Sequence, residues 1–280
     1  MKLSIITINR NNAEGLRKTM ESVLSQTYQN IEYIIIDGAS TDESVEIIRA
    51  TALQAEGLDM KWVSEKDKGI YDAMNKGVKK ATGDYVWILN SGDCAASSNT
   101  VEQMMRILSD SEIDILLGNK IQVYPGRKVE SRRRKVECVK PQPMDVSMLT
   151  FYSGTVPQDA AFVRRDLFAQ YGYFDDKLKI CADWKLYLNM IALGGVQPMY
   201  VNIDVVLFDM TGISNENHEL RLAERRAYLE EVIPASVLKD YDNYEFPIHE
   251  YRRLKKHHMW GLVYFIERVL FKLEKWGVLK

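Results

Sequence analysis

The first 120 residues alternate short apolar runs with segments whose apolar residues recur at helical spacing, and this alternation constrains the fold more than any other feature. The apolar runs, typical of buried strands, are residues 3–8, 31–36, 60–64 and 85–89. Helical spacing occurs at residues 16–24, 45–52, 70–81 and 101–108. Strands separated by helices of this length predict right-handed crossovers and a mainly parallel, Rossmann-like α/β sheet.

Polar turns follow the strands of this predicted sheet. They comprise residues 7–10, 37–38, 65–67 and 90–93. Ligands of such sheets bind at the carboxyl ends of the strands. We therefore expect the four turns to gather along one rim and to form the binding site.

Local signals mark where two of the helices begin. Asn11 and Asn12 are candidate caps for the first helix. Ser40 with Glu43 predicts a capping box for the second.

The composition narrows the class of protein. The chain has 280 residues and a formal net charge of -2, which allows a large core and argues against bulk attraction to nucleic acid. Its three cysteines form no Cys-x-x-Cys pair, so neither a disulfide framework nor a zinc site is expected. No signal peptide is visible, and no window reaches the ~20 apolar residues of a membrane-spanning helix. We expect a cytoplasmic protein that is soluble or bound at the inner face of the membrane.

Three segments in order carry a family resemblance: "LSIITINRNNAEGLRKTMESVLSQTYQNIEYIIIDGASTDES", "SEKDKGIYDAMNKGVKKATGDYVWILNSGD" and "CADWKLYL". Together they resemble the family 2 glycosyltransferases of bacterial surface polysaccharides. The resemblance implies the GT-A fold over 1–215, with a nucleotide-binding half (1–120) and an acceptor half (121–215), followed by a helical C-terminal extension (216–280). It also implies an inverting, metal-dependent hexosyl- or N-acetylhexosaminyltransferase that uses a nucleotide diphosphate sugar, such as a UDP-sugar. The implied acceptor is a glycan or a lipid-linked saccharide.

Asp93, in the turn "NSGD", is the candidate metal ligand. A leaving diphosphate develops negative charge, which a divalent cation stabilises, and Mg²⁺ or Mn²⁺ needs only one or two protein carboxylates. The resemblance places Asn90, Ser91 and Asp93 at the Asp-x-Asp motif of the family, so this chain lacks one or two of the family's carboxylates. A turn or helix cap is the alternative role of such an Asp.

Further candidates for donor binding lie along the rim. The resemblance places Thr7, Asn9 and Arg10 near the nucleoside, and Arg10 stands where the family often has an aromatic residue. Asp37 matches the family's base-contacting carboxylate, and a carboxylate that accepts the imide N–H of uracil favours a uridine or thymidine donor. The alternative for Asp37 is an Asx turn in "DGAS".

The segment "DKGIYDAMNKG" matches the part of the family that runs beneath the donor ribose and sugar. It contributes Asp67, Asp72 and Asn75 as candidates. For Asp72 and Asn75 the alternative is an ordinary polar position on an amphipathic helix.

Direct displacement needs a base for the acceptor hydroxyl, and Asp183 in "CADWKLYL" matches the family's base. A helix start favours the ionised carboxylate, although a simple cap is the alternative. Tyr152, Gln158 and Trp184 are candidates for choosing the acceptor. For Trp184, a place in the core is the alternative.

Other classes are less compatible with the sequence. A dinucleotide-dependent oxidoreductase would need a Gly-x-Gly-x-x-Gly turn after the first strand, where Asn9 to Asn12 stand instead. A sugar-nucleotide pyrophosphorylase would need a glycine-rich loop containing arginine at the same place. A non-catalytic scaffold or sugar-nucleotide-binding protein of the same fold remains the alternative function.

Two basic segments have no role in this scheme. Residues 127–135 hold six Lys or Arg and are interpreted as a solvated face or loop, with a diphosphate lid or a lipid-phosphate contact as alternatives. Residues 251–280 hold eight Lys or Arg and two Glu. Their apolar stripe is Met259, Leu262, Val263, Ile266, Val269, Leu270 and Leu273, flanked by Trp260 and Trp276. Such a helix is expected to bind an anionic membrane surface, or else to pack on the catalytic domain or on a second subunit of a homodimer.

Overall fold

The computed structural model describes residues 1–55, 57–124, 141–210, 217–256 and 260–275. The chain divides into two compact units, Met1–Tyr228 and Leu229–Lys280, each of which is described by itself. The basic segment 127–135 lies outside the described residues, as do Met259 and Trp276.

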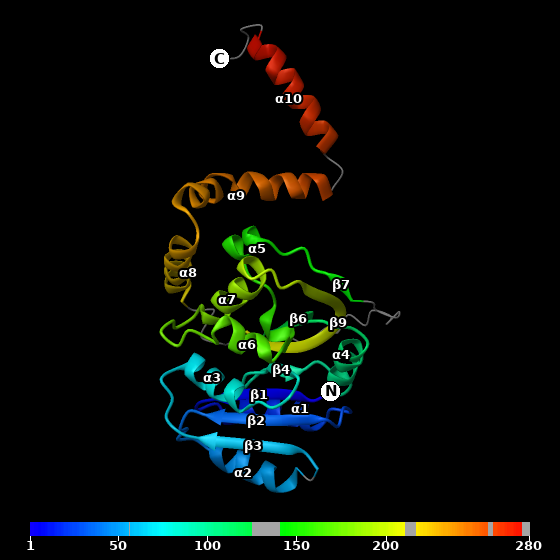
Figure 1. Ribbon diagram of the computed structural model, residues 1–280, viewed down its shortest axis with the longest axis vertical. Coiled ribbons are helices and arrows are strands. Elements are labelled where there is room, and N and C mark those ends of the chain that lie inside the picture. The colour runs from blue at the N-terminus through cyan, green and yellow to red at the C-terminus, as the bar shows by residue number, and fades with distance from the viewer. Residues whose placement is uncertain (56, 125–140, 211–216, 257–259, 276–280) are drawn as a thin grey trace. The chain divides into compact units, whose positions relative to one another are not determined.

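The first half of the Met1–Tyr228 unit has the predicted alternation of strands and helices. Its strands are β1 (Leu3–Asn9), β2 (Ile31–Asp37), β3 (Asp59–Ser64) and β4 (Tyr85–Ile88). Its helices are α1 (Ala13–Leu24), α2 (Ser44–Gln54), α3 (Ile70–Lys80) and α4 (Thr100–Ser109). The four strands are parallel and lie in the order β3-β2-β1-β4 (Figure 1). Their carboxyl ends therefore form one rim, as parallel strands require.

Helices cover both faces of this sheet. Leu16 of α1 packs in one cluster with Leu3 and Ile5, together with apolar residues of α2 and α4. α3 packs on the strands β1 and β2, and Gly77 of α3 lies so close to Ile6 that a Cβ there would collide with that side chain. Because Ile5 and Ile6 are neighbours on a strand, they point to opposite faces, so β1 is apolar on both.

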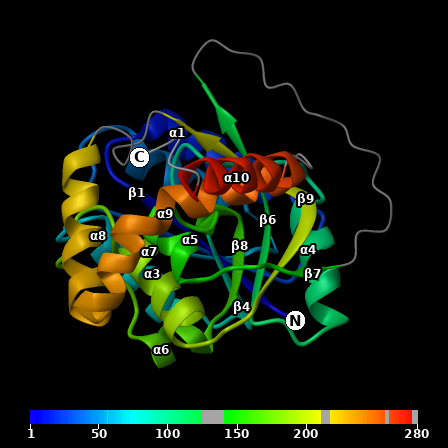
Figure 2. The ribbon, with the colours of Figure 1, turned by 90° about the horizontal axis from the view of Figure 1, so that it is seen from above.

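The second half of the sheet mixes parallel and antiparallel strands. These are β5 (Cys94–Ala95), β6 (Ile115–Val123), β7 (Gln142–Pro143), β8 (Ala161–Arg164) and β9 (Pro198–Asp209). β8 lies between β4 and β6 and is antiparallel to both, whereas β9 runs parallel to β6 (Figure 2). The helical elements are α5 (Met148–Ser153), η1 (Gln158–Ala160), α6 (Asp166–Tyr171), α7 (Ala182–Tyr187) and η2 (Leu188–Leu193). The predicted α/β class is confirmed, with antiparallel strands added in this half.

α8 (His218–Val232) runs from one compact unit into the other. The division falls after Tyr228, later than the boundary at 215 expected from the sequence. The first turns of α8 are bonded to the acceptor half; for example, the Tyr228 hydroxyl donates to Asn189 Oδ1 at 2.5 Å. The second unit holds the end of α8, α9 (Ala235–Lys256) and α10 (Trp260–Lys275). None of the described helices is long and apolar enough to cross a membrane.

One of the two predicted helix caps is present. The Asn12 side chain caps α1 by accepting from Gly15 N at 3.1 Å. The capping box predicted for Ser40 and Glu43 is wrong, because α2 begins only at Ser44 and has no side-chain cap. The Ser40 hydroxyl instead accepts from Asn11 N at 2.8 Å and donates to Asp37.

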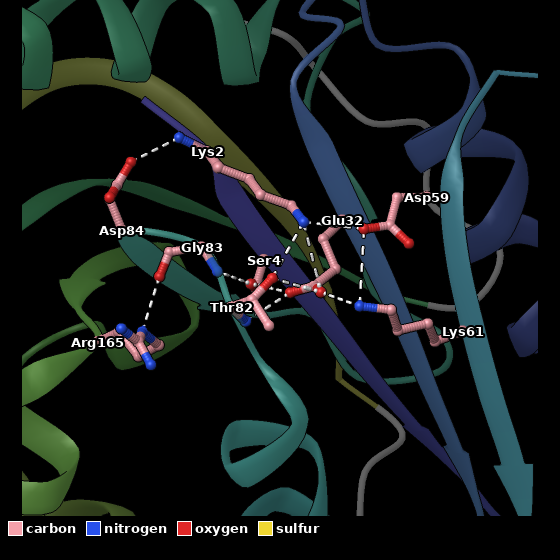
Figure 3. Close-up of polar contacts among 9 residues, drawn as sticks. All are labelled: Lys2, Ser4, Glu32, Asp59, Lys61, Thr82, Gly83, Asp84 and Arg165. Atoms are coloured by element: carbon pink, nitrogen blue, oxygen red, sulfur yellow. Dashed lines mark hydrogen bonds and ion pairs between the residues drawn. The ribbon is translucent and has the colours of Figure 1, made fainter.

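A buried ion network joins the starts of the strands, at the edge opposite the rim. Glu32 is fully buried, and its carboxylate accepts from Ser4 Oγ at 2.5 Å, Thr82 N at 2.8 Å and Lys61 Nζ at 2.5 Å (Figure 3). Lys2 Nζ lies 3.6 Å from the same carboxylate. Burial by itself would raise the pKa of Glu32, but these hydrogen bonds outweigh it and hold the pKa at about 2.

We expect Glu32→Gln to lower the free energy of unfolding at pH 7 by about 3 kcal/mol, because it removes the buried partner of Lys61. The folded-state pKa lies below the unfolded value, so this stabilisation is present above the unfolded pKa and is lost as the pH falls toward 2. Urea unfolding at pH 7 and pH 3 should therefore show a smaller difference from the wild type at pH 3. Glu46→Gln, on the exposed side of α2, is the control. An equal loss at both pH values would contradict the prediction.

Candidate active site

The carboxyl ends of β1, β2 and β3 are held together by one buried carboxylate. Asp37 is fully buried. Its Oδ1 accepts from Asn9 Nδ2 at 2.9 Å and Ser40 Oγ at 2.5 Å, while its Oδ2 accepts from Ser40 N at 2.9 Å and Ser64 Oγ at 2.6 Å. Burial by itself would raise the pKa of Asp37, but the Ser40, Ser64 and Asn9 hydrogen bonds outweigh it and lower the pKa.

Three residues expected to contact the donor make hydrogen bonds within the rim. The four donors occupy the carboxylate of Asp37, which has no exposed surface for the N–H of a base. Asn9 is 4% exposed, and its side-chain amide donates a hydrogen bond to Asp37. Thr7 is fully buried and donates to Leu89 O at 2.8 Å, tying β1 to the chain that follows β4. All three residues stabilise the rim from the interior of the sheet. The ends of neighbouring parallel strands lie side by side, so their polar side chains bond to one another.

Arg10 and Asp67 form the outer surface of this rim. Asp67 Oδ1 accepts from Gly69 N at 3.1 Å, and its Oδ2 occupies the space that a Cβ at Gly38 would need. Arg10 is exposed, and its Cδ lies 3.3 Å from the same Cβ position. The glycine after Asp37 thus leaves room for the Asp67 carboxylate and for the aliphatic part of the Arg10 side chain. Both groups are suited to contact ribose, base or phosphate.

The two candidates on α3 have structural partners. Asp72 accepts from Lys68 N at 3.0 Å and pairs with Lys76 at 3.3 Å, which stabilises the first turn of its own helix. Asn75 donates to Phe174 O at 2.8 Å and accepts from Phe174 N at 3.0 Å. Both polar ends of the Asn75 amide thus hold the chain at Phe174, which agrees with the alternative of a structural polar position.

The turn after β4 is fixed by α1. Asp93 N donates to Asn90 O at 3.0 Å, and Gly92 has a φ of 106°, which favours glycine. Thr19 Oγ of α1 accepts from Gly92 N at 3.0 Å and donates to Asp93 O at 2.7 Å. Ser91 O accepts from the asparagine that caps α1 at 3.2 Å. The turn is therefore pre-organised by a neighbouring helix, with its carboxylate turned to β9.

The end of β9 lies beside Asp93. Asp93 is 4% exposed, and its Oδ1 accepts from Asp209 N at 2.9 Å. Asp209 Oδ2 lies 3.4 Å from the Cβ position of Gly92, so both carboxylates border one turn. Burial, together with the charges of Asp159 and Asp209, raises the pKa of Asp93 to about 7.

The oxygen atoms around this turn fit a divalent cation that is shared with a substrate. Asp93 and Asp209 supply two carboxylates, and the buried Asn90 Oδ1 has no hydrogen-bond donor among the described residues. Mg²⁺ and Mn²⁺ prefer such oxygen ligands and keep positions for phosphate and water. Within the described ranges, no group of three or more His, Cys, Asp or Glu is arranged to hold a metal. An ion here would therefore take the rest of its ligands from its substrate.

Asp183 is the second residue of α7 and is half-buried. Its Oδ1 accepts from Trp184 N at 2.8 Å and lies 3.0 Å from Tyr71 OH, whose single proton is shared with Ile180 O at 2.5 Å. Its Oδ2 accepts from Gln158 Nε2. Burial raises the pKa of Asp183, with a contribution from Asp159, and outweighs these hydrogen bonds. The expectation that the helix start favours the ionised form is therefore reversed by burial. A carboxylate with a raised pKa is the better proton acceptor.

A glutamate of α8 fixes the turn that leads into α7. Glu224 accepts from Lys179 N at 2.7 Å, Ile180 N at 3.0 Å and Cys181 N at 3.0 Å. Charge-assisted bonds of this kind satisfy the N–H groups at the start of a helix. They therefore hold the backbone that presents Asp183.

A series of contacts through sequence neighbours leads from Asp183 to Asp93. It begins at Gln158, which donates to Asp183, and ends at Asp209 N, which donates to Asp93. Asp159 of η1 pairs with Lys120 Nζ of β6 at 2.5 Å. That Nζ lies 4.1 Å from the ring centroid of Phe208, the residue of β9 before the aspartate beside Asp93. After burial, the charge of Asp159 is a further cause of the raised pKa of both Asp93 and Asp183. The two carboxylates therefore border a common region.

Sequence reasoning missed several residues of this region, among them Asp209, Asp159 and Glu224. Asp209 had a usable signal, since it ends an apolar strand as Asp37 does. Asp159 lies in a three-residue 3-10 turn, and Glu224 is one of several acids on a charged helix. Neither of these two has a sequence pattern that distinguishes it.

The three residues expected to determine acceptor specificity lie in different environments. Gln158 contacts Asp183. Trp184 is 1% exposed and donates to Phe151 O at 2.9 Å, which agrees with its alternative role in the core. Tyr152 is half-buried on α5.

We expect Asp93→Asn to stabilise the protein at pH 8 in EDTA, because the amide avoids burying a charge. The folded-state pKa lies above the unfolded value, so the wild type loses stability as the pH rises through about 7, whereas the variant does not. Urea unfolding should show the advantage of the variant growing by about 2 kcal/mol between pH 5 and pH 8. Asp166→Asn, on an exposed side chain of α6, should show no such change. An advantage that does not depend on pH would refute the prediction.

The chain is similar in sequence to known glycosyltransferases. A model described as glycosyl transferase family 2 matches residues 4–172. An uncharacterised glycosyltransferase of Mycobacterium tuberculosis is 32% identical over 217 residues, which cover 76% of this chain and 77% of that protein. A glycosyltransferase of PGL/p-HBAD biosynthesis from Mycobacterium bovis is 27% identical over 214 residues, covering 76% of this chain and 78% of its own.

Solved structures share the fold. TarS of S. aureus, residues 1–349 in complex with UDP-GlcNAc, has a TM-score of 0.62 at 19% identity, over 78% of this chain and 61% of that one. A mannosyltransferase from Pyrobaculum calidifontis, in complex with GDP-Man and Mn²⁺, has a TM-score of 0.58 at 18% identity, over 81% and 61%. This chain thus spans less than two thirds of the length of either. The GT-A-like architecture, the family model and the sequence relatives agree, and the chain belongs to glycosyltransferase family 2.

Proposed function

We propose that the protein is a metal-dependent, inverting glycosyltransferase that moves a sugar from a UDP-sugar to a saccharide or lipid-linked saccharide acceptor. The observation that carries the proposal is the connection of Asp93 to Asp183 through the Asp159–Lys120 ion pair. A transferase needs a group that stabilises the leaving diphosphate and a base for the acceptor, placed around one region. The fold alone would not distinguish transfer from binding.

The donor nucleoside would lie against Arg10 and Asp67. Arg10 is exposed, and Asp67 lies at the rim over Gly38. Asp67 would accept from ribose hydroxyls or the base, and Arg10 would bind phosphate or stack on the base. A UDP-sugar is supported by the TarS complex, whereas the mannosyltransferase complex contains GDP-Man, so the base is a matter for experiment.

Asp93 and Asp209 would hold the divalent cation, with the Asn90 amide oxygen beside them. The ion would neutralise charge on the donor diphosphate. The "NSGD" turn has only one carboxylate, and in this assignment Asp209 at the end of β9 supplies a second one. It is supported by the complex of the mannosyltransferase with Mn²⁺.

Asp183 would act as the base of a single displacement. The acceptor hydroxyl gives its proton to the Asp183 carboxylate, and its oxygen forms a bond to the anomeric carbon. The bond from that carbon to the diphosphate oxygen breaks, and the nucleoside diphosphate leaves with the electron pair. One displacement inverts the anomeric carbon, and Tyr71 and Gln158 would keep the carboxylate oriented.

We expect Asp93→Asn and Asp183→Asn each to lower transfer by at least about 1,000-fold, for different reasons. Asp93→Asn should also weaken Mn²⁺-dependent UDP-sugar binding in calorimetry by about tenfold, because it removes a metal ligand. Asp183→Asn should leave donor binding unchanged. Turnover that survives in Asp183→Asn would remove this residue from the base role.

We expect Tyr71→Phe to move the acidic limb of the kcat/KM profile to higher pH, because its hydroxyl favours the ionised form of Asp183. At pH 6 the loss of kcat/KM should be about fivefold, and it should diminish at pH 8.5. Tyr33→Phe is the matched control, since the buried Tyr33 hydroxyl donates to Thr7 instead. A uniform loss across the pH range would indicate a packing effect only.

Hydrolysis of UDP-, GDP- and dTDP-sugars in the presence of Mn²⁺ would identify the donor. A non-catalytic sugar-nucleotide-binding protein would bind one of them without turnover, with or without acceptor. A scaffold would show no metal-dependent binding at all.

A further inference from the structure

α10 carries a broad apolar face that is open to solvent. Phe265, Ile266, Val269 and Leu270 are 63%, 47%, 39% and 43% exposed. Their spacing places them on one side of the helix. An exposed apolar surface of this kind marks an interaction site more often than a solvated surface.

Two basic side chains lie along one edge of this face. Arg268 and Lys272 are both exposed, and Arg268 lies 6.0 Å from the ring centroid of Tyr264. The surrounding sequence 251–280 holds eight Lys or Arg and two Glu, in a chain whose formal net charge is -2. The positive charge is thus concentrated in the segment of sequence that contains the apolar face.

The charge and the shape of this face favour one kind of partner. Two copies of a cationic helix would repel one another, and a coiled-coil seam is narrower than a face with adjacent pairs such as Phe265–Ile266 and Val269–Leu270. A spanning helix is not available among the described residues. A bilayer with anionic headgroups satisfies both the apolar side and the basic flank.

We propose that α10 lies in the headgroup region of an anionic membrane, with Phe265, Ile266, Val269 and Leu270 directed toward the acyl chains. Arg268 and Lys272 contact lipid phosphates at the flank. Phe271 is two positions beyond Val269 and points about 160° away from it, so it stays on the water side. The proposed attachment to the membrane depends on α10 alone. It does not depend on the glycosyl transfer proposed for the residues of the rim.

Co-sedimentation of the full chain with vesicles tests this placement. The protein should bind phosphatidylcholine vesicles containing 30 mol% phosphatidylglycerol at least about tenfold more tightly than pure phosphatidylcholine, and 0.5 M NaCl should weaken the binding. Absence of binding to the anionic vesicles, or equal binding to both, would overturn the proposal.

A matched pair of variants tests which side of α10 faces the lipid. Phe265→Ser should weaken binding to the anionic vesicles by about tenfold, whereas Phe271→Ser, which alters an equally exposed phenylalanine of the same helix, should leave it unchanged. An equal effect of both variants would overturn the assigned face. Light scattering without vesicles completes the test. A dimer that Phe265→Ser dissociates, with no vesicle binding, would assign the face to a second copy of the chain.

Discussion

The geometry of the rim depends on the burial of the Asp37 carboxylate at the ends of three parallel strands. Its four hydrogen bonds join Asn9 of β1, Ser64 of β3 and the Ser40 turn. A buried carboxylate without these donors would cost several kcal/mol, so the four groups are stable only together. Arg10 and Asp67 take their positions from this arrangement, because both approach the glycine that follows Asp37.

The buried carboxylates of the molecule fall into two groups. Glu32 and Asp37 are surrounded by donors that outweigh burial and lower the pKa of both. For Asp93 and Asp183, burial outweighs the donors and raises the pKa. A carboxylate of the first group holds strands together, whereas one of the second retains capacity for a cation or a proton. The distinction agrees with the roles proposed for Asp93 and Asp183.

Short elements in the second half of the sheet region position Asp183. The 3-10 turn η1 carries Gln158, which orients Asp183, and Asp159, which pairs with Lys120. Glu224 then ties the start of α7 to α8. Because each contact joins segments far apart in the chain, the position of the base depends on the packing of the whole half and not on α7 alone.

The sequence determined the strands, the helices and the rim, because apolar periodicity and strand-end polarity are local properties that tertiary packing preserves. Asp93 and Asp183 were likewise predicted from their positions in recognisable segments. The sequence could not distinguish Asp37, Thr7, Asn9 and Asn75 as supports, since burial and hydrogen-bond saturation depend on neighbours from other strands and helices. For the same reason, only the tertiary structure brought Asp209 beside Asp93 and placed Asp159 and Glu224 around the site: these contacts are made between residues that no local pattern connects.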